Sequence, residues 1–424
     1  MQFMTINTIA DYLLAYVYYY PLFMSYLWMC GGIYYRFHWE NAGGRHYDNP
    51  PELDSYPFVS MLIPCHNESE NIEETIVYAS QQAYPNYEII AINDGSDDDT
   101  GAILDRLQIR YPQLRVVHLK NNRGKAMALK MGAMVSKSEF LVCIDSDAVL
   151  DPSAMQWMMD HFIRSPRVGA VTGNPRIRNR STLLGKIQVG EFSSIIGLIK
   201  RAQRIYGRIF TVSGVVTAFR KSALQRVDYW STDIQTEDID ISWRLQLDHW
   251  DIRYEPNALC WILMPETYSG LWAQRLRWAK GGVETALRYT TTLFAWRKRR
   301  MWMVLVEYFL SVVWSYIAAV ILLLWLLGKF LVFPEEYAVP SIVPGWNGVV
   351  LATTCLLQFI VSLLIDSRYE KGLWKHFYWM VWYPLAYWLI NTLTIVSAVP
   401  MVLFRGANKS GKWDSPDRGL KNET

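Results

Sequence analysis

The sequence has little cysteine and no pattern that would turn its cysteines into a structural framework. Its 424 residues include five cysteines, and none stands in a CxxC pair or at another spacing typical of metal ligands. Cys30 and Cys355 lie in apolar runs, and Cys143 lies in a short run typical of a buried strand. We therefore expect no disulfide framework and a reducing compartment for the soluble part of the chain.

The chain also has little excess of one sign of charge over the other. The formal net charge is only +3, which excludes a polyanion-binding surface over the whole protein. No internal repeat or low-complexity segment stands out. In contrast, hydrophobic residues make up 51% of the chain, and tryptophan alone occurs 19 times. This hydrophobic content is high for a soluble enzyme, yet the chain also carries many polar motifs. We therefore expect the excess of apolar residues to be segregated into membrane spans.

Long apolar runs that could cross the roughly 30 Å hydrocarbon core of a bilayer occur at both ends of the chain. They are residues 12–35, 303–327, 349–365 and 377–404. The first has neither the basic n-region nor the small-residue cleavage site of a secretory leader, so we interpret it as an anchor. Basic residues flank these runs, namely Arg36, His38, Arg45, residues 297–300, Arg368, Lys371 and Lys375. By the positive-inside rule, the segment between the first two runs is then cytoplasmic.

The last apolar run leaves the topology open. It contains Pro384 and Pro400, so it could span the membrane with a kink, re-enter it or lie in the interface. If all four runs span, the basic tail at residues 405–424 lies outside the cell, against the positive-inside rule.

Strand and helix patterns alternate between the first two apolar runs. Short apolar runs typical of buried strands occupy residues 59–63, 87–92, 114–119 and 140–144, with helical patterns at 72–81, 99–110 and 124–136. This order predicts an α/β domain built on a parallel sheet. We therefore divide the chain into a transmembrane segment (1–40), a linker (41–58), a cytoplasmic α/β domain (59–270), an interfacial region (271–302), transmembrane segments (303–404) and the tail.

Two carboxylates directly follow the fourth predicted strand. Asp145 and Asp147 stand one residue apart, at the edge where open α/β sheets bind ligands. Carboxylates this close repel each other, and a hard cation such as Mg²⁺, held by one or two carboxylates plus substrate phosphates, relieves that repulsion. The alternative is a solvated turn whose aspartates cap the next helix.

Further polar groups could join this site. Asp94 ends the second strand and could accept hydrogen bonds from a base or ribose, and Lys125 could meet a phosphate at a helix start. Within Thr236-Glu237-Asp238 a carboxylate could act as general base. In residues 274–278 (Gln-Arg-Leu-Arg-Trp) a guanidinium could bind phosphate and the indole could stack on a sugar.

Each of these groups also has a purely structural interpretation. Asp94-Gly95 is a good turn pair, Thr236 could merely cap a helix, and residues 274–278 could form an amphipathic interfacial helix. We expect the neighbouring Asp240 to lie on a solvated helix face.

In combination and in this order, the motifs Asp94, Asp145-x-Asp147, Thr236-Glu237-Asp238 and Gln274-x-x-Arg277-Trp278 resemble those of processive family 2 glycosyltransferases. Residues 171–178, 185–190, 260–267 and 415–419 are similar to the subfamily of bacterial poly-β-1,6-N-acetyl-D-glucosamine synthases, which make a biofilm polysaccharide. The resemblance implies an α/β GT-A domain with a Rossmann-like parallel sheet, flanked by transmembrane helices. It also implies a multi-pass protein of the bacterial inner membrane. The N-terminus departs from some relatives, because it holds one apolar run where they have two spans.

The resemblance also implies a role for each motif. Asp94 would contact the uridine of UDP-N-acetylglucosamine, and Asp145 and Asp147 would contact its diphosphate and a divalent cation, Mg²⁺ or Mn²⁺. Asp238 would be the catalytic base of an inverting transfer. The expected substrate-binding residues are Asp94, Lys125, Glu237, Gln274, Arg277 and Trp278.

As partners, the resemblance suggests a small two-span membrane subunit and control by cyclic di-GMP, although no RxxxR followed by DxSxxG is visible. No nucleic acid is expected. Synthesis of chitin, hyaluronan or cellulose, transfer of one sugar to a lipid phosphate, and a non-catalytic membrane sensor of sugar nucleotides remain as alternatives.

Overall fold

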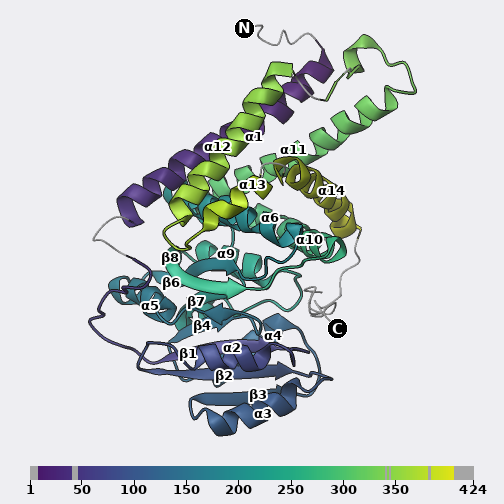
Figure 1. The fold of residues 1–424 in the computed structure, drawn as a ribbon. Coiled ribbons are helices and arrows are strands. Elements are labelled where there is room, and N and C mark those ends of the chain that lie inside the picture. The colour runs from purple at the N-terminus through teal and green to yellow at the C-terminus, as the bar shows by residue number, and fades with distance from the viewer. Residues whose placement is uncertain (1–7, 41–45, 340, 343–344, 381–382, 405–424) are drawn as a thin grey trace.

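The protein consists of an α/β body at one end and long helices at the other (Figure 1). The computed structural model describes residues 8–40, 46–339, 341–342, 345–380 and 383–404. Expectations for Arg45, the tail at 405–424 and the resemblance at 415–419 lie outside the described residues.

The α/β body is built on one eight-stranded sheet in the order β3-β2-β1-β4-β7-β6-β8-β5. The strands are β1 (Val59–Cys65), β2 (Tyr87–Asp94), β3 (Leu114–Leu119), β4 (Phe140–Ile144), β5 (Val149–Leu150), β6 (Val168–Ile177), β7 (Val216–Arg220) and β8 (Asp251–Ile262). The four strands predicted from the sequence, β1 to β4, are all present and run parallel to one another.

Beyond β4 the sheet is mixed, because β7 runs antiparallel to both β4 and β6. The first residue of β7, Val216, pairs with the last residue of β4, Ile144. The chain leaves β6 at the carboxyl edge of the sheet and does not return to the opposite edge before β7. Strand β7 therefore begins at the carboxyl edge and runs antiparallel to its two neighbours. Val149 and Leu150 of β5 also pair antiparallel with β8.

Helices cover both faces of the sheet. One face carries α2 (Ile72–Ala79), α3 (Thr100–Arg110) and α5 (Ala154–Arg164); the other carries α4 (Lys125–Val135), α8 (Lys221–Arg226) and α9 (Glu237–Leu247). Neighbouring strand residues face opposite layers, so Met61 and Ile63 of β1 pack against the first layer and Leu62 against the second. Every side chain of β1 is buried, as a parallel sheet between two helix layers requires.

The remaining helices form the membrane side of the protein. They are α1 (Ile9–Tyr35), η1 (Arg36–Glu40), α6 (Leu183–Glu191), η2 (Phe192–Leu198), α7 (Ile199–Tyr206), α10 (Tyr268–Leu293), η3 (Trp296–Met301), α11 (Trp302–Leu327), η4 (Glu335–Tyr337), α12 (Gly345–Asp366), η5 (Leu373–His376), α13 (Phe377–Met380) and α14 (Tyr383–Leu403). Among the described residues, three stretches are long and apolar enough to span a bilayer: Trp296–Leu327, Asn347–Asp366 and Ala386–Leu403.

Two predicted spans need separate description. Helix α1 is not among these three, because its many tyrosines lower its hydropathy, yet it packs along both α11 and α12 (Figure 1). The last predicted run, residues 377–404, forms two helices, α13 and α14. Helix α14 packs against α10 and α11, and its C-terminal end lies beside α10 (Figure 1).

A buried ionic cluster joins the membrane helices to the α/β body. Arg176 of β6 contacts Asp366 at 2.7 Å and Glu370 at 2.9 Å, both at the end of α12. Arg201 of α7 contacts Asp366 at 3.1 Å and Glu40 of η1 at 2.6 Å. All five residues are at most 9% exposed, so the cluster fixes the two parts in one relative position.

Candidate active site

Asp94 organises the carboxyl edge of the sheet. This last residue of β2 is fully buried, and its carboxylate accepts hydrogen bonds from the backbone N–H of Arg123, at 3.0 Å, and of Gly124, at 2.7 Å. Burial raises the pKa of Asp94, and the two amide donors offset part of that effect. The carboxylate thus holds the N-terminus of α4 at the sheet edge.

A glycine allows the neighbouring loop to come this close. Gly95 has a φ of +62°, and a Cβ there would lie 2.6 Å from the backbone of Asn121 and Asn122. Asn122 in turn lies 2.8 Å from the His66 ring, just beyond β1. The Asp94-Gly95 turn is therefore real, and it serves to bring three strand ends together.

Lys125 connects two of the predicted motifs. Its ammonium group lies 2.5 Å from Asp145, 3.5 Å from Glu237 and 3.0 Å from the carbonyl oxygen of Gly214. Burial alone would lower the pKa of Lys125, but the carboxylates of Asp145 and Glu237 more than reverse this and raise it. The sequence predicted a phosphate contact for this lysine, whereas in the structure it forms a bridge between carboxylates.

A hydrogen bond from α2 fixes the turn that carries Asp145 and Asp147. The carbonyl oxygen of Ser146 accepts a hydrogen bond from the Thr75 hydroxyl of α2 at 2.7 Å, and Asp147 is only 7% exposed. No group of three or more His, Cys, Asp or Glu side chains suited to a metal occurs in the described part of the chain. Two carboxylates nevertheless fit a Mg²⁺-type ion that takes its other ligands from phosphate and water. The Lys125 ammonium already marks Asp145 as a position that attracts positive charge.

Asp238 lies in the first turn of α9. Burial, and then the neighbouring carboxylate of Glu237, raise the pKa of Asp238 to about 6, against the opposing charges of Lys125 and Arg277. A carboxylate tuned toward neutrality is suited to accept a proton. Thr236 precedes the helix without a capping hydrogen bond from its side chain, so capping alone does not explain this motif.

Helix α10 is clamped against the Thr236-Glu237-Asp238 segment. A Cβ at Gly281 would lie 1.9 Å from the Thr236 hydroxyl oxygen, so only glycine permits this approach. The same helix carries residues 274–278. Arg275 binds Glu191 at 2.8 Å, and its guanidinium stacks over the Trp278 ring at 4.3 Å.

The functional candidates on α10 differ in exposure. Gln274 accepts a hydrogen bond from Arg275 at 3.2 Å and is half-buried, as is Trp278, which packs against the main core cluster. Arg277 is exposed, and its charge acts on Asp238. The interfacial-helix interpretation therefore coexists with a role in the site.

The expectation for Asp240 was wrong. Its side chain is fully buried and pairs with Arg244 at 2.8 Å and with the Tyr289 hydroxyl at 2.7 Å. Tyr289 belongs to α10, so the buried face of α9 is set by a helix distant in sequence.

Sequence reasoning missed Lys200, which lies in α7. It is 5% exposed, and its ammonium lies 3.4 Å from the Thr172 hydroxyl. Burial lowers the pKa of Lys200 to about 7, partly opposed by the charge of Asp238. No local sequence signal identifies it, because Lys200 is followed by Arg201, Gln203 and Arg204, and its burial depends on tertiary packing.

A cavity lies among the membrane helices. It lies between α1, η2, α11, α12 and α14. Its walls are mostly apolar and aromatic, with a few polar side chains among them: Tyr20, Pro21, Met24, Ser25, Trp28, Ser194, Ile199, Ser311, Trp314, Cys355, Gln358, Phe359, Tyr387, Trp388 and Asn391. Such a lining suits a polar ligand with flat faces, such as a sugar chain.

The mixed sheet with acidic residues at its carboxyl edge has the GT-A fold of glycosyltransferases, as two comparisons show. A mannosyltransferase from Pyrobaculum calidifontis, solved with GDP-mannose and Mn²⁺, has a similar fold, with a TM-score of 0.55 at 16% identity over 92% of this chain and 99% of that one. Residues 57–281 match the model of the glycosyltransferase like family 2.

Relatives align over almost the whole chain. A poly-β-1,6-N-acetyl-D-glucosamine synthase from Staphylococcus epidermidis is 41% identical over 95% of this chain and 97% of its own length. One from Staphylococcus aureus is 40% identical over the same shares. The chain therefore belongs to glycosyltransferase family 2, in the group of poly-β-1,6-N-acetyl-D-glucosamine synthases.

Proposed function

We propose that this enzyme polymerises N-acetylglucosamine from UDP-N-acetylglucosamine into poly-β-1,6-N-acetyl-D-glucosamine for biofilm formation. The near full-length identity to synthases of that name supports the product. The single observation that carries the chemistry is the Lys125 bridge, which puts Asp145 and Glu237 within 3.5 Å of one ammonium group. Donor-binding and base-bearing motifs thus form one site.

In the proposed reaction, Asp238 takes the proton of the acceptor hydroxyl as its oxygen attacks the anomeric carbon of the donor. The bond to UDP breaks on the opposite side, so the α-linked donor gives a β-linkage by one inversion. Asp145 and Asp147 would hold Mg²⁺ or Mn²⁺, which would neutralise the diphosphate. Arg277 would stabilise the charge that grows on the leaving UDP.

The other predicted residues would position the substrates. Asp94 would bind the uridine, while Lys125 and Glu237 would order the diphosphate side of the site. Gln274 would contact the diphosphate, and Trp278 would stack on the terminal sugar of the acceptor. The cavity between the membrane helices would receive the growing polymer.

We propose an inner-membrane topology in which α1, α11 and α12 span the bilayer and α14 lies in the interface beside α10. The contact of α14 with α10 supports this arrangement. Residues 59–270 and the interfacial region 271–302 would then be cytoplasmic, and the basic tail would be cytoplasmic too. A reporter fused after Thr424 that is active only outside the cytoplasm tests this, because four spans would activate it.

A small two-span subunit and cyclic di-GMP remain proposed partners, with the basic, aromatic region around residues 275–300 as their contact. Activity of the purified chain, with and without cyclic di-GMP and the subunit, tests this. Full activity alone, unchanged by the nucleotide, would remove both.

The deciding experiment feeds the purified enzyme separate UDP-sugars and analyses product linkage. We expect β-1,6-linked polymer from UDP-N-acetylglucosamine alone. A product with another linkage or another sugar would instead assign a chitin, hyaluronan or cellulose type of synthase. Donor binding without UDP release in the presence of acceptor would indicate a sensor.

A further inference from the structure

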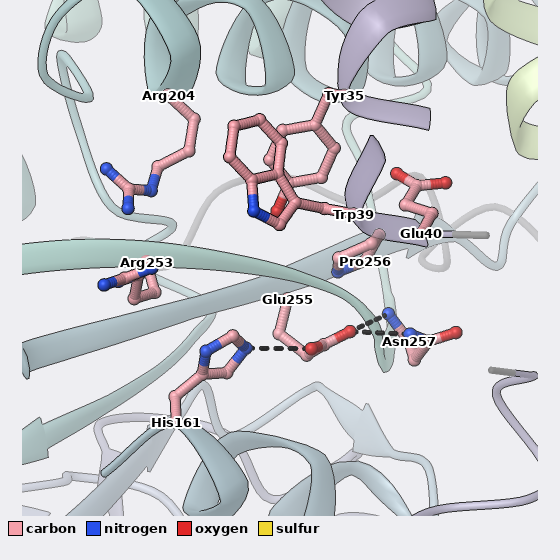
Figure 2. Close-up of a pocket in the computed structure, with 9 residues that line it drawn as sticks. All are labelled: Tyr35, Trp39, Glu40, His161, Arg204, Arg253, Glu255, Pro256 and Asn257. Atoms are coloured by element: carbon pink, nitrogen blue, oxygen red, sulfur yellow. Dashed lines mark hydrogen bonds and ion pairs between the residues drawn. The ribbon is translucent and has the colours of Figure 1, made fainter. Parts of the chain in front are cut away.

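A second pocket lies where the domain-side end of α1 rests on the α/β body. It lies between α1, η1, α5, α7 and β8 and is partly open to solvent (Figure 2). The residues that line it are Tyr35, Trp39, Glu40, His161, Arg204, Arg253, Glu255, Pro256 and Asn257. None of them belongs to the candidate active site.

Two arginines at one end of this pocket have no direct ion-pair partner. Arg204 and Arg253 form no hydrogen bond or ion pair with any residue that the structure describes, and the buried Nε of Arg253 has no acceptor. The charge of Asp251 acts on both, but its carboxylate is bound to Arg208 at 2.5 Å. Their guanidinium groups lie at the same end of the pocket (Figure 2). The pKa of Arg204 is lowered by burial and then by the charge of Arg253, so the two cations repel each other. An anion placed between them would relieve this repulsion.

The acidic residues of the pocket do not supply that anion, because each is engaged elsewhere. Glu255 accepts hydrogen bonds from Asn257, at 2.7 Å, and lies 2.8 Å from the His161 ring. Glu40 binds Arg201 at 2.6 Å and the Tyr369 hydroxyl at 2.9 Å. Figure 2 shows Glu40 at the end of the pocket opposite the two arginines.

The surface around the pocket has the composition of a membrane interface. Tyr34 at the end of α1, and Phe37 and Trp39 of η1, are 52%, 70% and 43% exposed. Aromatic side chains gather at the headgroup level of a bilayer, and basic pockets beside membrane helices on the cytoplasmic side bind anionic lipid headgroups. Trp39 belongs both to this exposed group and to the pocket wall.

We propose that this pocket binds the headgroup phosphate of an anionic phospholipid of the cytoplasmic leaflet, between the guanidinium groups of Arg204 and Arg253. The site goes beyond the proposed transferase activity and depends only on α1 entering the bilayer from this side. An occupied site would tie η1, α7 and β8 to the membrane surface.

The test measures the association of spin-labelled phosphatidylglycerol and phosphatidylcholine with the full chain in detergent micelles, by electron spin resonance. We expect the wild type to prefer phosphatidylglycerol, and R204Q/R253Q to lose about fivefold in relative affinity for each arginine removed. The matched control R106Q/R110Q removes the same charge from exposed α3 and should keep the preference. R204K/R253K should retain most of it.

Three outcomes would overturn the proposal: an unchanged preference in R204Q/R253Q, an equal loss in the α3 control, or displacement of the lipid by millimolar inorganic phosphate. The last would assign the site to free phosphate. If the double variant fails to fold, R253Q alone tests the same point at a position only partly buried. Product linkage is read separately, so failure here leaves the transferase proposal standing.

Discussion

The ionic cluster at the membrane junction and the charged groups at the carboxyl edge of the sheet differ in how their charges are balanced. At the junction, every carboxylate has at least one guanidinium partner: Glu40, Asp366 and Glu370 contact Arg36, Arg176, Arg180, Arg201 and Arg368. At the sheet edge, the Lys125 ammonium faces three carboxylates, those of Asp145, Glu237 and Asp238, with Asp94 and Asp147 at neighbouring strand ends. The charges of Lys200 and Arg277 also act on Asp238.

This difference indicates that the junction cluster supports the fold and that the sheet edge serves the reaction. A buried cluster in which every carboxylate has a guanidinium partner needs no ligand, and its loss leaves charges in the protein interior. An acidic surplus at a strand edge disfavours the empty site and favours a cation and a proton, the two species that the proposed reaction needs there. Substituting a charged residue in either cluster tests this difference.

The largest effect is expected at the metal-binding carboxylates. Asp147→Asn should lower polymer synthesis by more than about 10⁴-fold, because it removes one of the two proposed protein ligands of the divalent cation. EDTA should do the same to the wild type, with Mg²⁺ or Mn²⁺ restoring activity. Incorporation of radiolabelled sugar measures both, and full activity in metal-free buffer would contradict the assignment.

The second effect concerns the base. Asp238→Asn keeps the shape of the side chain and removes its basicity, so synthesis should fall by about 10²–10⁴-fold while calorimetry shows donor binding near the wild-type level. Glu237→Gln should cost less. Asp228→Asn, at a side chain that is 90% exposed, is the neutral control, since Asp240 is buried and does not qualify.

Two results would require a different base. Wild-type synthesis by Asp238→Asn would place the base elsewhere, and complete loss of donor binding would make Asp238 a donor-site residue.

The third prediction removes one charge from the junction cluster. Arg176→Met takes from Asp366 and Glu370 the buried guanidinium that they share and leaves them only Arg201 and Arg180. It should lower the free energy of unfolding by about 3–5 kcal/mol, the usual cost of removing one partner from a buried ion pair. Thermal unfolding in detergent measures the loss. Arg226→Met, which breaks an exposed pair with Asp248, should cost at most about 1 kcal/mol. Equal losses in the two variants would show that the junction cluster stabilises nothing.

The sequence predicted the elements whose pattern is local. Strands β1 to β4 are short apolar runs bounded by turn residues, and their parallel order follows from the intervening helices. The reversal of β7 was not predictable, because it depends on pairing between Ile144 and Val216, which are distant in sequence.

The same limit applies to the site. The motifs containing Asp94, Asp145 and Asp238 were recognised from residue type and order. The bridge from Lys125 to Glu237, the buried pairing of Asp240 and the position of Lys200 near Asp238 all depend on tertiary packing. Local sequence carries no information on which helix face another helix will cover.

The smallest expected effect concerns the pH dependence of catalysis, which the charges around Asp238 set. The pKa of Asp238 is about 6, and only its deprotonated form can accept a proton, so kcat/KM should fall as the pH drops through about 6. Besides Lys200, the charges acting on Asp238 are those of Glu237, Lys125 and Arg277. Lys200→Met removes a nearby positive charge, which favours the protonated form of Asp238. The acidic limb of the profile should therefore move to higher pH, by about half a pH unit.

A control separates this effect from simple loss of packing. Lys221→Met removes a lysine whose ammonium binds the carbonyl oxygen of Ser136, on another part of the sheet, and should leave the profile in place. If Lys200→Met lowers activity equally at every pH, Lys200 supports the fold without acting on the base. An acidic limb that stays in place at full activity would show that the buried lysine is neutral in the working enzyme, and a shift toward lower pH would contradict the sign required by a cation beside Asp238.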